Sequence, residues 1–261
     1  MLNVGLGLAK QIESVARRAG QEIMRIYETD FDIEAKGDKS PVTKADKIAE
    51  EQITRAIIEG VTADFPVVGE EAASMGKLPN VPDTPFWLVD PLDGTKEFIS
   101  RNGEFTVNIA LIENAKPILG IVHVPINSVS YCGLNSGTFK IGNNQTRVNI
   151  QCRQAQGGLT ALVSRSHRTP DIDIYLDNFN ITSEASAGSS LKFCRIAEGI
   201  ADIYPRLGRT MEWDTAAGHA VMYFAGGSVK TLDGEELTYG KPGFENPHFV
   251  AVGPGVLASQ K

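Results

Sequence analysis

The chain has 261 residues, of which 42% are hydrophobic and 22% charged, and its formal net charge is −7 with a pI near 5.2. This composition is ordinary for a folded globular protein and excludes a largely disordered chain. The acidic balance argues against broad binding to nucleic acid or to an anionic membrane surface, because both need a basic face. A small anionic substrate would therefore have to be bound through metal ions or local basic side chains.

The cysteines and the apolar runs bear on the cellular compartment. Cys132, Cys152 and Cys194 are widely spaced and form no C-x-x-C pair, so we expect reduced thiols rather than disulfides or a zinc site. The N-terminus shows no basic segment followed by an apolar one, and no run of about 18 apolar residues occurs. The sequence predicts a soluble, cytoplasmic protein without a transmembrane segment.

The first elements in the chain are two predicted helices. Residues 4–27 place apolar side chains at steps of three and four, which indicates a helix with one buried stripe. After a turn-rich segment at 35–41, Thr43 and Asp46 have capping-box spacing, so a second helix should begin near Thr43. Asp46 is thus explained either as a helix-start carboxylate or as part of a functional site.

Two short apolar runs then end in acidic residues. Residues 65–68 lead into Gly-Glu-Glu at 69–71, where an extended backbone would turn the two glutamates to opposite sides. Residues 86–89 read as a buried strand that leads into Asp-Pro-Leu-Asp-Gly-Thr at 90–95. Because Pro91 disfavours helix at the residue before it, we expect a turn that brings both aspartates to one side.

The segment 90–95 has the composition of a metal site. Asp90, Asp93 and the Leu92 carbonyl are hard oxygen donors that suit Mg2+, which keeps several waters and shares positions with phosphate oxygens. Gly94 and Thr95 offer backbone N–H groups to an anion where a helix begins. An Asp-Pro turn that caps a helix explains the same residues. The acids at the other element ends favour the metal site.

The remainder of the chain changes from a strand meander to alternating elements. Four runs with short polar connections predict an antiparallel sheet: 105–112, 118–124, 129–133 and 138–141. A polar, glycine-bearing stretch at 151–158 marks a lobe boundary. Beyond it, alternating elements favour an α/β lobe, with strands near 159–164, 181–185, 201–204, 229–232 and 249–252 and helices near 171–179, 189–198 and 214–224.

The last of these helices carries a third acid. Asp214, in Trp-Asp-Thr-Ala-Ala-Gly at 213–218, stands at the predicted N-cap, where a carboxylate is favoured whatever its function. We expect this helix start, and the one at Ser189, to face the acids of the first half.

The three acidic segments, Gly-Glu-Glu at 69–71, Asp-Pro-Leu-Asp-Gly-Thr at 90–95 and Trp-Asp-Thr-Ala-Ala-Gly at 213–218, resemble the signature of the lithium-sensitive, Mg2+-dependent inositol monophosphatase family and occur in its order. Other segments resemble its CysQ-type 3'(2'),5'-bisphosphate nucleotidase branch: SPVT at 40–43, KEFI at 96–99, RNGEFTVN at 101–108, SRSHR at 164–168 and GSSLKFC at 188–194. Together these segments span most of the chain.

The resemblance implies a fold that combines α+β and α/β parts, a two-lobed layered α-β-α-β-α sandwich with the site between the lobes. Residues 1–154 would form the N-terminal α+β lobe, with the antiparallel sheet and most metal ligands. Residues 155–261 would form the C-terminal α/β lobe, which adds Asp214 and nucleotide-binding residues.

The resemblance also implies two Mg2+ ions, or three if Asp46 binds a further, weaker one. Glu70, Asp90 and the Leu92 carbonyl would hold the first ion, and Asp90, Asp93 and Asp214 the second. Metal-activated water would then attack the phosphorus in line, since phosphoryl transfer depends on positioning and electrostatics.

Other residues would assist this attack. The Thr95 hydroxyl would orient the water, Glu70 would be near enough to accept its proton, and Asp46 would activate it if it binds no metal. The Gly94 and Thr95 amides would grip the phosphoryl oxygens. Lys96 and Glu97 are expected to flank the site.

The substrate implied is 3'-phosphoadenosine 5'-phosphate, hydrolysed to AMP and phosphate in support of sulfur assimilation. Its second phosphate and base would need donors from His167, Ser189, Lys192 and Arg206, although each is equally well explained as a surface or ion-paired residue. The alternative is an inositol or sugar monophosphatase on the same scaffold. A non-catalytic calcium-binding module is disfavoured, because it needs a denser ligand set.

The resembled nucleotidases include proteins found peripherally on the inner membrane, a location that this sequence leaves open. The oligomeric state is likewise open between monomer and homodimer.

Overall fold

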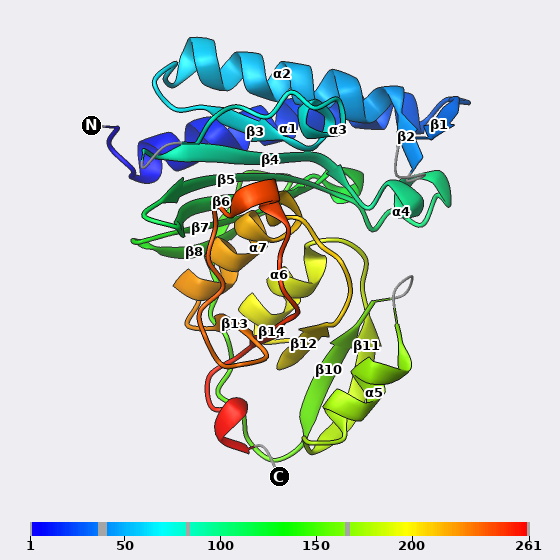
Figure 1. Cartoon of the computed structure of the whole chain (residues 1–261), viewed down its shortest axis with the longest axis vertical. Helices are drawn as coiled ribbons and strands as arrows, with labels where there is room; N and C mark the ends of the chain where they lie inside the picture. The colour runs from blue at the N-terminus through cyan, green and yellow to red at the C-terminus, as the bar shows by residue number, and fades with distance from the viewer. Residues whose placement is uncertain (1, 36–40, 82–83, 165–167, 260–261) are drawn as a thin grey trace.

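The computed structural model describes residues 2–35, 41–81, 84–164 and 168–259 (Figure 1). Its layers follow the order helix, sheet, helix, sheet, helix, which confirms the predicted layered sandwich of α+β and α/β parts. Helices α1 (Leu6–Tyr27) and α2 (Lys44–Gly60) cover the outer face of the first sheet. Both match the predicted helices at the start of the chain.

The predicted capping box at the start of α2 is present. The Thr43 hydroxyl accepts from the Ala45 N–H at 3.2 Å, and the Asp46 carboxylate accepts from the Thr43 N–H at 2.8 Å. The short hairpin of β1 (Ile33–Ala35) and β2 (Pro41–Thr43) precedes it.

The first sheet has seven strands in chain order, and β3 is parallel to β4 whereas the other neighbours are antiparallel. The predicted meander is confirmed as β5 to β8, and β9 was missed. The strands are β3 (Val67–Gly69), β4 (Phe86–Asp93), β5 (Thr106–Glu113), β6 (Lys116–Val124), β7 (Val129–Leu134), β8 (Gly137–Ile141) and β9 (Arg147–Asn149).

The second sheet has five strands in the order β11-β10-β12-β14-β13, of which the first three are parallel. They are β10 (Leu159–Val163), β11 (Ile181–Ser186), β12 (Ile203–Arg206), β13 (Ser228–Thr231) and β14 (Phe249–Val252). Helix α5 (Pro170–Leu176) covers its outer face. Residues 150–158 join the two sheets, and the lobe boundary at 154/155 stays a prediction.

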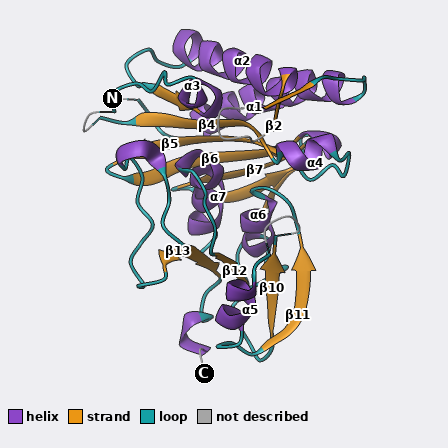
Figure 2. Cartoon of the chain, turned by 45° about the vertical axis from the view of Figure 1, so that its right-hand side comes forward, coloured by secondary structure: helices purple, strands orange, loops and turns teal. Residues whose placement is uncertain are grey.

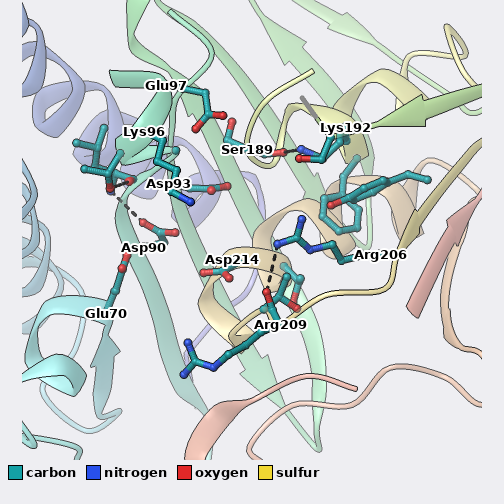
Figure 3. A pocket seen from close by; sticks show the side chains of 18 of the residues that line it. Glu70, Asp90, Asp93, Lys96, Glu97, Ser189, Lys192, Arg206, Arg209 and Asp214 are labelled. Carbon is teal, nitrogen blue, oxygen red and sulfur yellow. Dashed lines mark hydrogen bonds between the residues drawn. The ribbon is translucent and has the colours of Figure 1, made fainter. Parts of the chain in front are cut away.

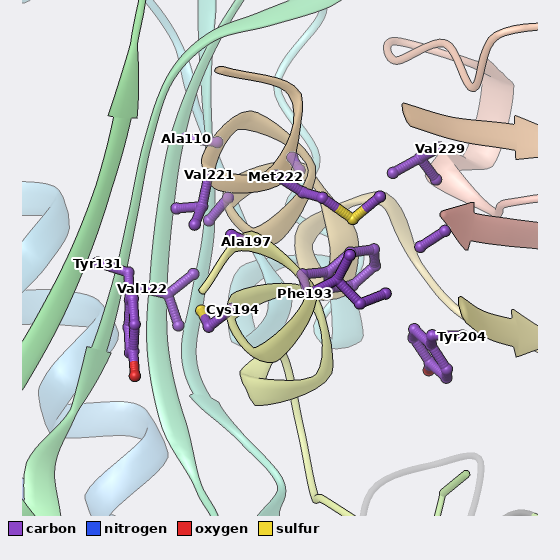
Figure 4. Close-up of a cluster of buried hydrophobic side chains, with 14 of the residues drawn as sticks. Ala110, Val122, Tyr131, Phe193, Cys194, Ala197, Tyr204, Val221, Met222 and Val229 are labelled. Carbon is purple, nitrogen blue, oxygen red and sulfur yellow. The ribbon is translucent and has the colours of Figure 1, made fainter. Parts of the chain in front are cut away.

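Helices α6 (Leu191–Ala197) and α7 (Glu212–Phe224) lie between the two sheets (Figure 2). A large buried cluster fills this layer, in which Val122 of β6, Phe193 of α6 and Met222 of α7 are joined by Tyr204 of β12 (Figure 4). The cysteines predicted to be unpaired are free and buried.

Helix α7 approaches the first sheet at backbone contact distance. A Cβ added at Gly120 of β6 would lie 2.5 Å from the Ala217 carbonyl oxygen, and one added at Gly133 of β7 would lie 2.5 Å from the Ala220 oxygen. The absence of side chains at these two positions therefore lets α7 rest directly on the sheet. This contact sets the distance between the N-terminus of α7 and β4.

We expect Gly133→Ala to lower the free energy of unfolding by about 1–3 kcal/mol, because a methyl group forced into packed backbone strains both elements. Urea denaturation measures this change. Gly7→Ala is the matched control, because Gly7 lies in α1 with no atom within 4 Å of the added Cβ, and there alanine should stabilise the helix by about 0.5–1 kcal/mol. Equal unfolding free energies for the two variants would contradict the contact.

Candidate active site

One pocket of about 250 Å³ lies between the first sheet and the inner helices, and it contains most of the predicted site residues. Glu70, Asp90, Asp93 and Asp214 lie in one part of it, with Lys96 beside Asp93, and Lys192 and Arg206 lie in the other part (Figure 3). The predicted residues that line it are Glu70, Asp90, Leu92, Asp93, Gly94, Thr95, Ser189, Lys192, Arg206 and Asp214. His167 lies outside the described residues.

A β-bulge places Asp90 and Asp93 on the same side of β4. Two residues three apart in a regular strand would face opposite sides of the sheet. Asp90 pairs with Asn108 and Asp93 with Thr106, so β4 carries one extra residue between these pairs. Leu92 accordingly packs in the core under α1 and α2, and both carboxylates line the pocket. The turn predicted after Val89 is wrong, because β4 continues through Pro91 to Asp93.

Glu70 and Glu71 do not lie on an extended backbone, as the sequence analysis expected. They form the first turn of the short helix α3 (Glu70–Ser74). The Glu50 carboxylate accepts from the N–H groups of Glu71 at 2.7 Å and Ala72 at 2.8 Å, which satisfies the start of this helix. Glu70 lines the pocket, whereas Glu71 is buried on the other side of α3, beside Glu50 and α2.

Asp46 lies next to Thr95. The Thr95 hydroxyl is 3.2 Å from the Asp46 carboxylate and 3.3 Å from the Leu92 carbonyl oxygen, and both contacts have donor geometry for the hydroxyl. Asp46 is fully buried and also accepts from the backbone and hydroxyl of Thr43. The carboxylate therefore caps α2 and also contacts Thr95, which lines the pocket, and its role in the site stays a prediction. Gly94, with φ of 93°, makes the sharp entry into α4 (Thr95–Ile99).

Asp214 is not the N-cap of α7, as the sequence analysis expected. The helix begins two residues earlier, and Asp214 is its third residue. From there its carboxylate accepts from the Met211 N–H at 2.8 Å and lines the pocket. Ser189 likewise precedes α6 rather than beginning it.

Asp93 accepts hydrogen bonds from two residues that the sequence analysis did not single out. The Asn108 side-chain amide donates to Asp93 Oδ2 at 3.1 Å, and the Ser190 N–H donates to the same oxygen at 2.7 Å. Neither has a local pattern that distinguishes it, since one is a strand residue and the other lies at a distant helix start.

The gathered acids repel one another. Burial raises the pKa of Asp90 well above its usual value, and the carboxylates of Glu70 and Asp93 raise it further. Burial also raises the pKa of Asp93, although Lys192 and Asn108 oppose this. The pKa of Asp214 rises to about 8 through burial and the negative charge of Asp93.

This donor set fits a hard divalent cation. It consists of carboxylate and carbonyl oxygens, the ligands that Mg2+ and Ca2+ prefer, and a cation would relieve the repulsion that raises these pKa values. Within the described ranges, however, no three acid, histidine or cysteine side chains lie close enough together to hold one metal ion between them. The acids instead line one part of the pocket wall.

The opposite part of the pocket is cationic. Lys192 is buried, donates to the Ala187 and Ser189 carbonyls at 3.1 and 2.7 Å, and lies over the Tyr204 ring. Burial lowers the pKa of Lys192 to about 8; Asp93 opposes this, and the positive charge of Arg206 adds to it. The Nε of Arg206 and the Oγ of Ser189 are buried without a hydrogen-bond partner among the described residues. This part of the pocket thus offers donors to an anion.

Several other residues line the pocket. Lys96 extends beside Asp93 and Glu97 lies close by, in agreement with the expected flanking positions (Figure 3). Arg209 and Thr210 were not anticipated, because they lie in a loop without a recognisable pattern.

A sequence profile described as the inositol monophosphatase family matches residues 8–257. The chain belongs to the inositol monophosphatase family. Within this family it is 45% identical over 242 residues to the 3'(2'),5'-bisphosphate nucleotidase CysQ of Escherichia coli strain K12, a match that covers 92% of this chain and 97% of the relative. The protein of the same name from Haemophilus influenzae is 34% identical over 266 residues, covering 97% and 95%.

Solved structures of the inositol monophosphatase family agree with this result. CysQ from Bacteroides thetaiotaomicron superposes with a TM-score of 0.80 at 37% identity, covering 96% of this chain and 98% of that one. An inositol monophosphatase from Anabaena superposes with a TM-score of 0.76 at 22% identity, covering 96% and 92%, and shares the fold. None of the helices in the described ranges has the length and apolar character to span a membrane.

Proposed function

We propose that this protein is a Mg2+-dependent 3'(2'),5'-bisphosphate nucleotidase that hydrolyses 3'-phosphoadenosine 5'-phosphate to AMP and phosphate. The observation that carries the proposal is a single pocket with four acids, Glu70, Asp90, Asp93 and Asp214, in one part and the cations Lys192 and Arg206 in the other. The acidic part suits metal ions and the reacting phosphate, and the cationic part suits a second phosphate. The CysQ relatives support this assignment.

In the acidic part, Glu70, Asp90 and the Leu92 carbonyl would hold one Mg2+ ion, and Asp90, Asp93 and Asp214 a second. Asp46 remains a candidate ligand for a third. Bound Mg2+ would lower the pKa of water and neutralise charge on the leaving oxygen. The protein's contribution is to place these oxygens on rigid elements, a strand and two helix starts.

The hydrogen bond between Thr95 and Asp46 supports a role in orienting the attacking water. When the Thr95 hydroxyl donates to Asp46, its lone pairs are left to accept a proton of the water. Asp46 then fixes which way the hydroxyl points. Glu70, on the same wall of the pocket, is the acceptor we assign to the second proton. The Gly94 and Thr95 amides would bind the phosphoryl oxygens.

The cationic part would bind the 5'-phosphate. Lys192 and Arg206 carry like charges in one part of the pocket, and the charge of Arg206 lowers the pKa of Lys192, an effect that an anion bound near both would offset. Ser189 offers a hydroxyl to the same anion. His167 is retained as a further candidate donor. The buried, unpaired cysteines support a reducing compartment, the cytoplasm, as the place of action.

Phosphate release tests the assignment. The bisphosphorylated nucleotide and inositol 1-phosphate are compared at matched concentrations, with Mg2+ and with EDTA. We expect release from the nucleotide only with Mg2+ and a clear preference for it. Equal or reversed preference would indicate an inositol or sugar monophosphatase instead, and no release from either substrate would indicate a non-catalytic metal-binding module.

Arg206→Met should separate recognition from chemistry. We expect kcat/KM for 3'-phosphoadenosine 5'-phosphate to fall by about 10–100-fold, since a hydrogen bond to a charged group contributes about 1.5–3 kcal/mol. Turnover of 3'-AMP, which lacks the second phosphate, should change little. Arg195→Met serves as a control, because this α6 arginine pairs with Glu198 and does not line the pocket. An equal loss of kcat/KM for both nucleotides would mean that Arg206 does not recognise the second phosphate.

A further inference from the structure

A buried hydrogen-bond network joins Asp93 of β4 to the neighbouring strand β5 and to the start of α6. Asn108 of β5 and Ser190 before α6 are each 1% exposed, and the Asn108 amide donates to Asp93 Oδ2 at 3.1 Å and to Ser190 Oγ at 3.0 Å. Ser190 returns its N–H to Asp93 Oδ2 at 2.7 Å. The Thr106 hydroxyl donates to Oδ1 of the Asn108 side chain at 3.0 Å, which fixes the orientation of the side-chain amide.

This network also reaches α7. The Ser190 hydroxyl donates to the Asp214 carbonyl oxygen at 2.8 Å. One serine therefore contacts the side chain of Asp93 on β4 and the backbone of Asp214 on α7. Ser189, immediately before it, has φ of 42°, an unusual conformation for a residue with a side chain. With Ser189 in this conformation, the N–H of Ser190 points at Asp93.

The consequence for Asp93 is that its two oxygens have different environments. Oδ2 accepts two hydrogen bonds, from Asn108 and from Ser190, whereas no described residue donates a hydrogen bond to Oδ1. A carboxylate with one oxygen held by two donors on different elements cannot rotate freely. Oδ1 is then kept available to a cation in the pocket.

We propose that Asn108 and Ser190 are positioning residues that orient Asp93 for cation binding and set its distance from Asp214. This inference rests on the proposed metal-dependent function. Neither residue is proposed to contact the metal or the substrate. Groups that orient metal ligands in this way typically change metal affinity by about 10–100-fold when they are removed.

The test is cation affinity, measured apart from turnover. Mn2+ is titrated into the intact protein and followed by the EPR signal of the free ion, and Mg2+ is then used to displace it. We expect Asn108→Ala to weaken Mn2+ binding by about 10–100-fold. Activity of this variant should recover towards that of the unaltered protein as Mg2+ is raised. Ser190→Ala, which keeps the N–H donor, should weaken binding less.

Thr138→Val is the matched control. Thr138 is also buried and makes a side-chain hydrogen bond to α7, to the Val221 carbonyl oxygen at 3.1 Å. Its loss should lower the melting temperature without changing Mn2+ affinity. In the double variant of Asn108 and Ser190, the combined loss should be smaller than the product of the single losses, because both residues act on one carboxylate.

The outcomes are separable. Unchanged Mn2+ affinity in folded Asn108→Ala would overturn the positioning role, whatever happens to its melting temperature. Should Asn108→Ala fail to fold, unchanged affinity in Ser190→Ala would overturn the role equally. A lack of Mn2+ binding by the unaltered protein would overturn the proposed metal-dependent function itself.

Discussion

Asp90→Asn is expected to abolish turnover and to stabilise the cation-free protein. Asp90 is the carboxylate that we assign to both Mg2+ ions. Removal of one electrostatic group lowers kcat by up to about 10³-fold, and we expect a loss of at least this size because two ions are affected. The pKa of Asp90 in the folded protein lies above the usual value through burial and the carboxylates of Glu70 and Asp93. The ionised form is therefore less favourable in the folded chain than in the unfolded chain, and replacing it with an amide removes this penalty at neutral pH.

Phosphate release and thermal unfolding, each with and without Mg2+, measure both effects. The variant should melt at a higher temperature than the unaltered protein without Mg2+ and should lose most of the stabilisation by Mg2+. Retained activity would mean that the bridging ligand has been misassigned. A lower melting temperature without Mg2+ would contradict the repulsion among the acids.

Asp202→Asn is the matched control with the opposite expected sign. Burial would raise the pKa of Asp202, but hydrogen bonds from Arg153, at 2.7 Å, and from the Thr160 N–H lower it. A lowered pKa means that the ionised form stabilises the fold above the pKa of the unfolded chain, and this contribution is lost as pH falls. The variant should melt lower at neutral pH and keep its turnover, because Asp202 lies outside the pocket.

Thr95→Ala is expected to lower kcat by about 10²–10⁴-fold, the range for a group that assists proton transfer in the transition state. KM should change little, because the metal ions and backbone amides would still bind the phosphate. Thr95→Ser keeps the hydroxyl 3.2 Å from Asp46 and should retain most of the activity. Steady-state kinetics at saturating Mg2+ gives both constants. A change confined to KM would show that Thr95 binds the substrate without orienting water.

The periodic elements of this fold were predictable from the sequence. The apolar stripe of α1, the capping box of α2 and the meander from β5 to β8 all follow from local patterns. Local patterns suffice there because burial on one face imposes a fixed period on the sequence. The acids that line the pocket were found from the ends of such elements and from the family resemblance.

The geometry around these acids was not predictable. The bulge in β4 depends on register with β5, and the sequence showed only a proline where a turn was expected. At the start of α3 the N–H groups of Glu71 and Ala72 donate to Glu50, which lies 21 and 22 residues away in the chain, and no local pattern reveals this. Asn108 and Ser190 belong to segments quoted for the resemblance, yet their contacts with Asp93 arise only when β5 pairs with β4 and the start of α6 packs against this sheet.

The backbone contact of α7 with β6 and β7 has a consequence for how this scaffold diversifies. This close packing ties Asp214 of α7 to the sheet that carries Asp90 and Asp93, so the acids proposed to bind metal lie on elements in direct backbone contact. The cations of the proposed recognition part, Lys192 and Arg206, come from α6 and β12, which lie outside this sheet and helix. We therefore expect that the preference for one phosphate ester over another can be changed at Lys192 and Arg206, by selection or by engineering, while the acids proposed to bind metal keep their places.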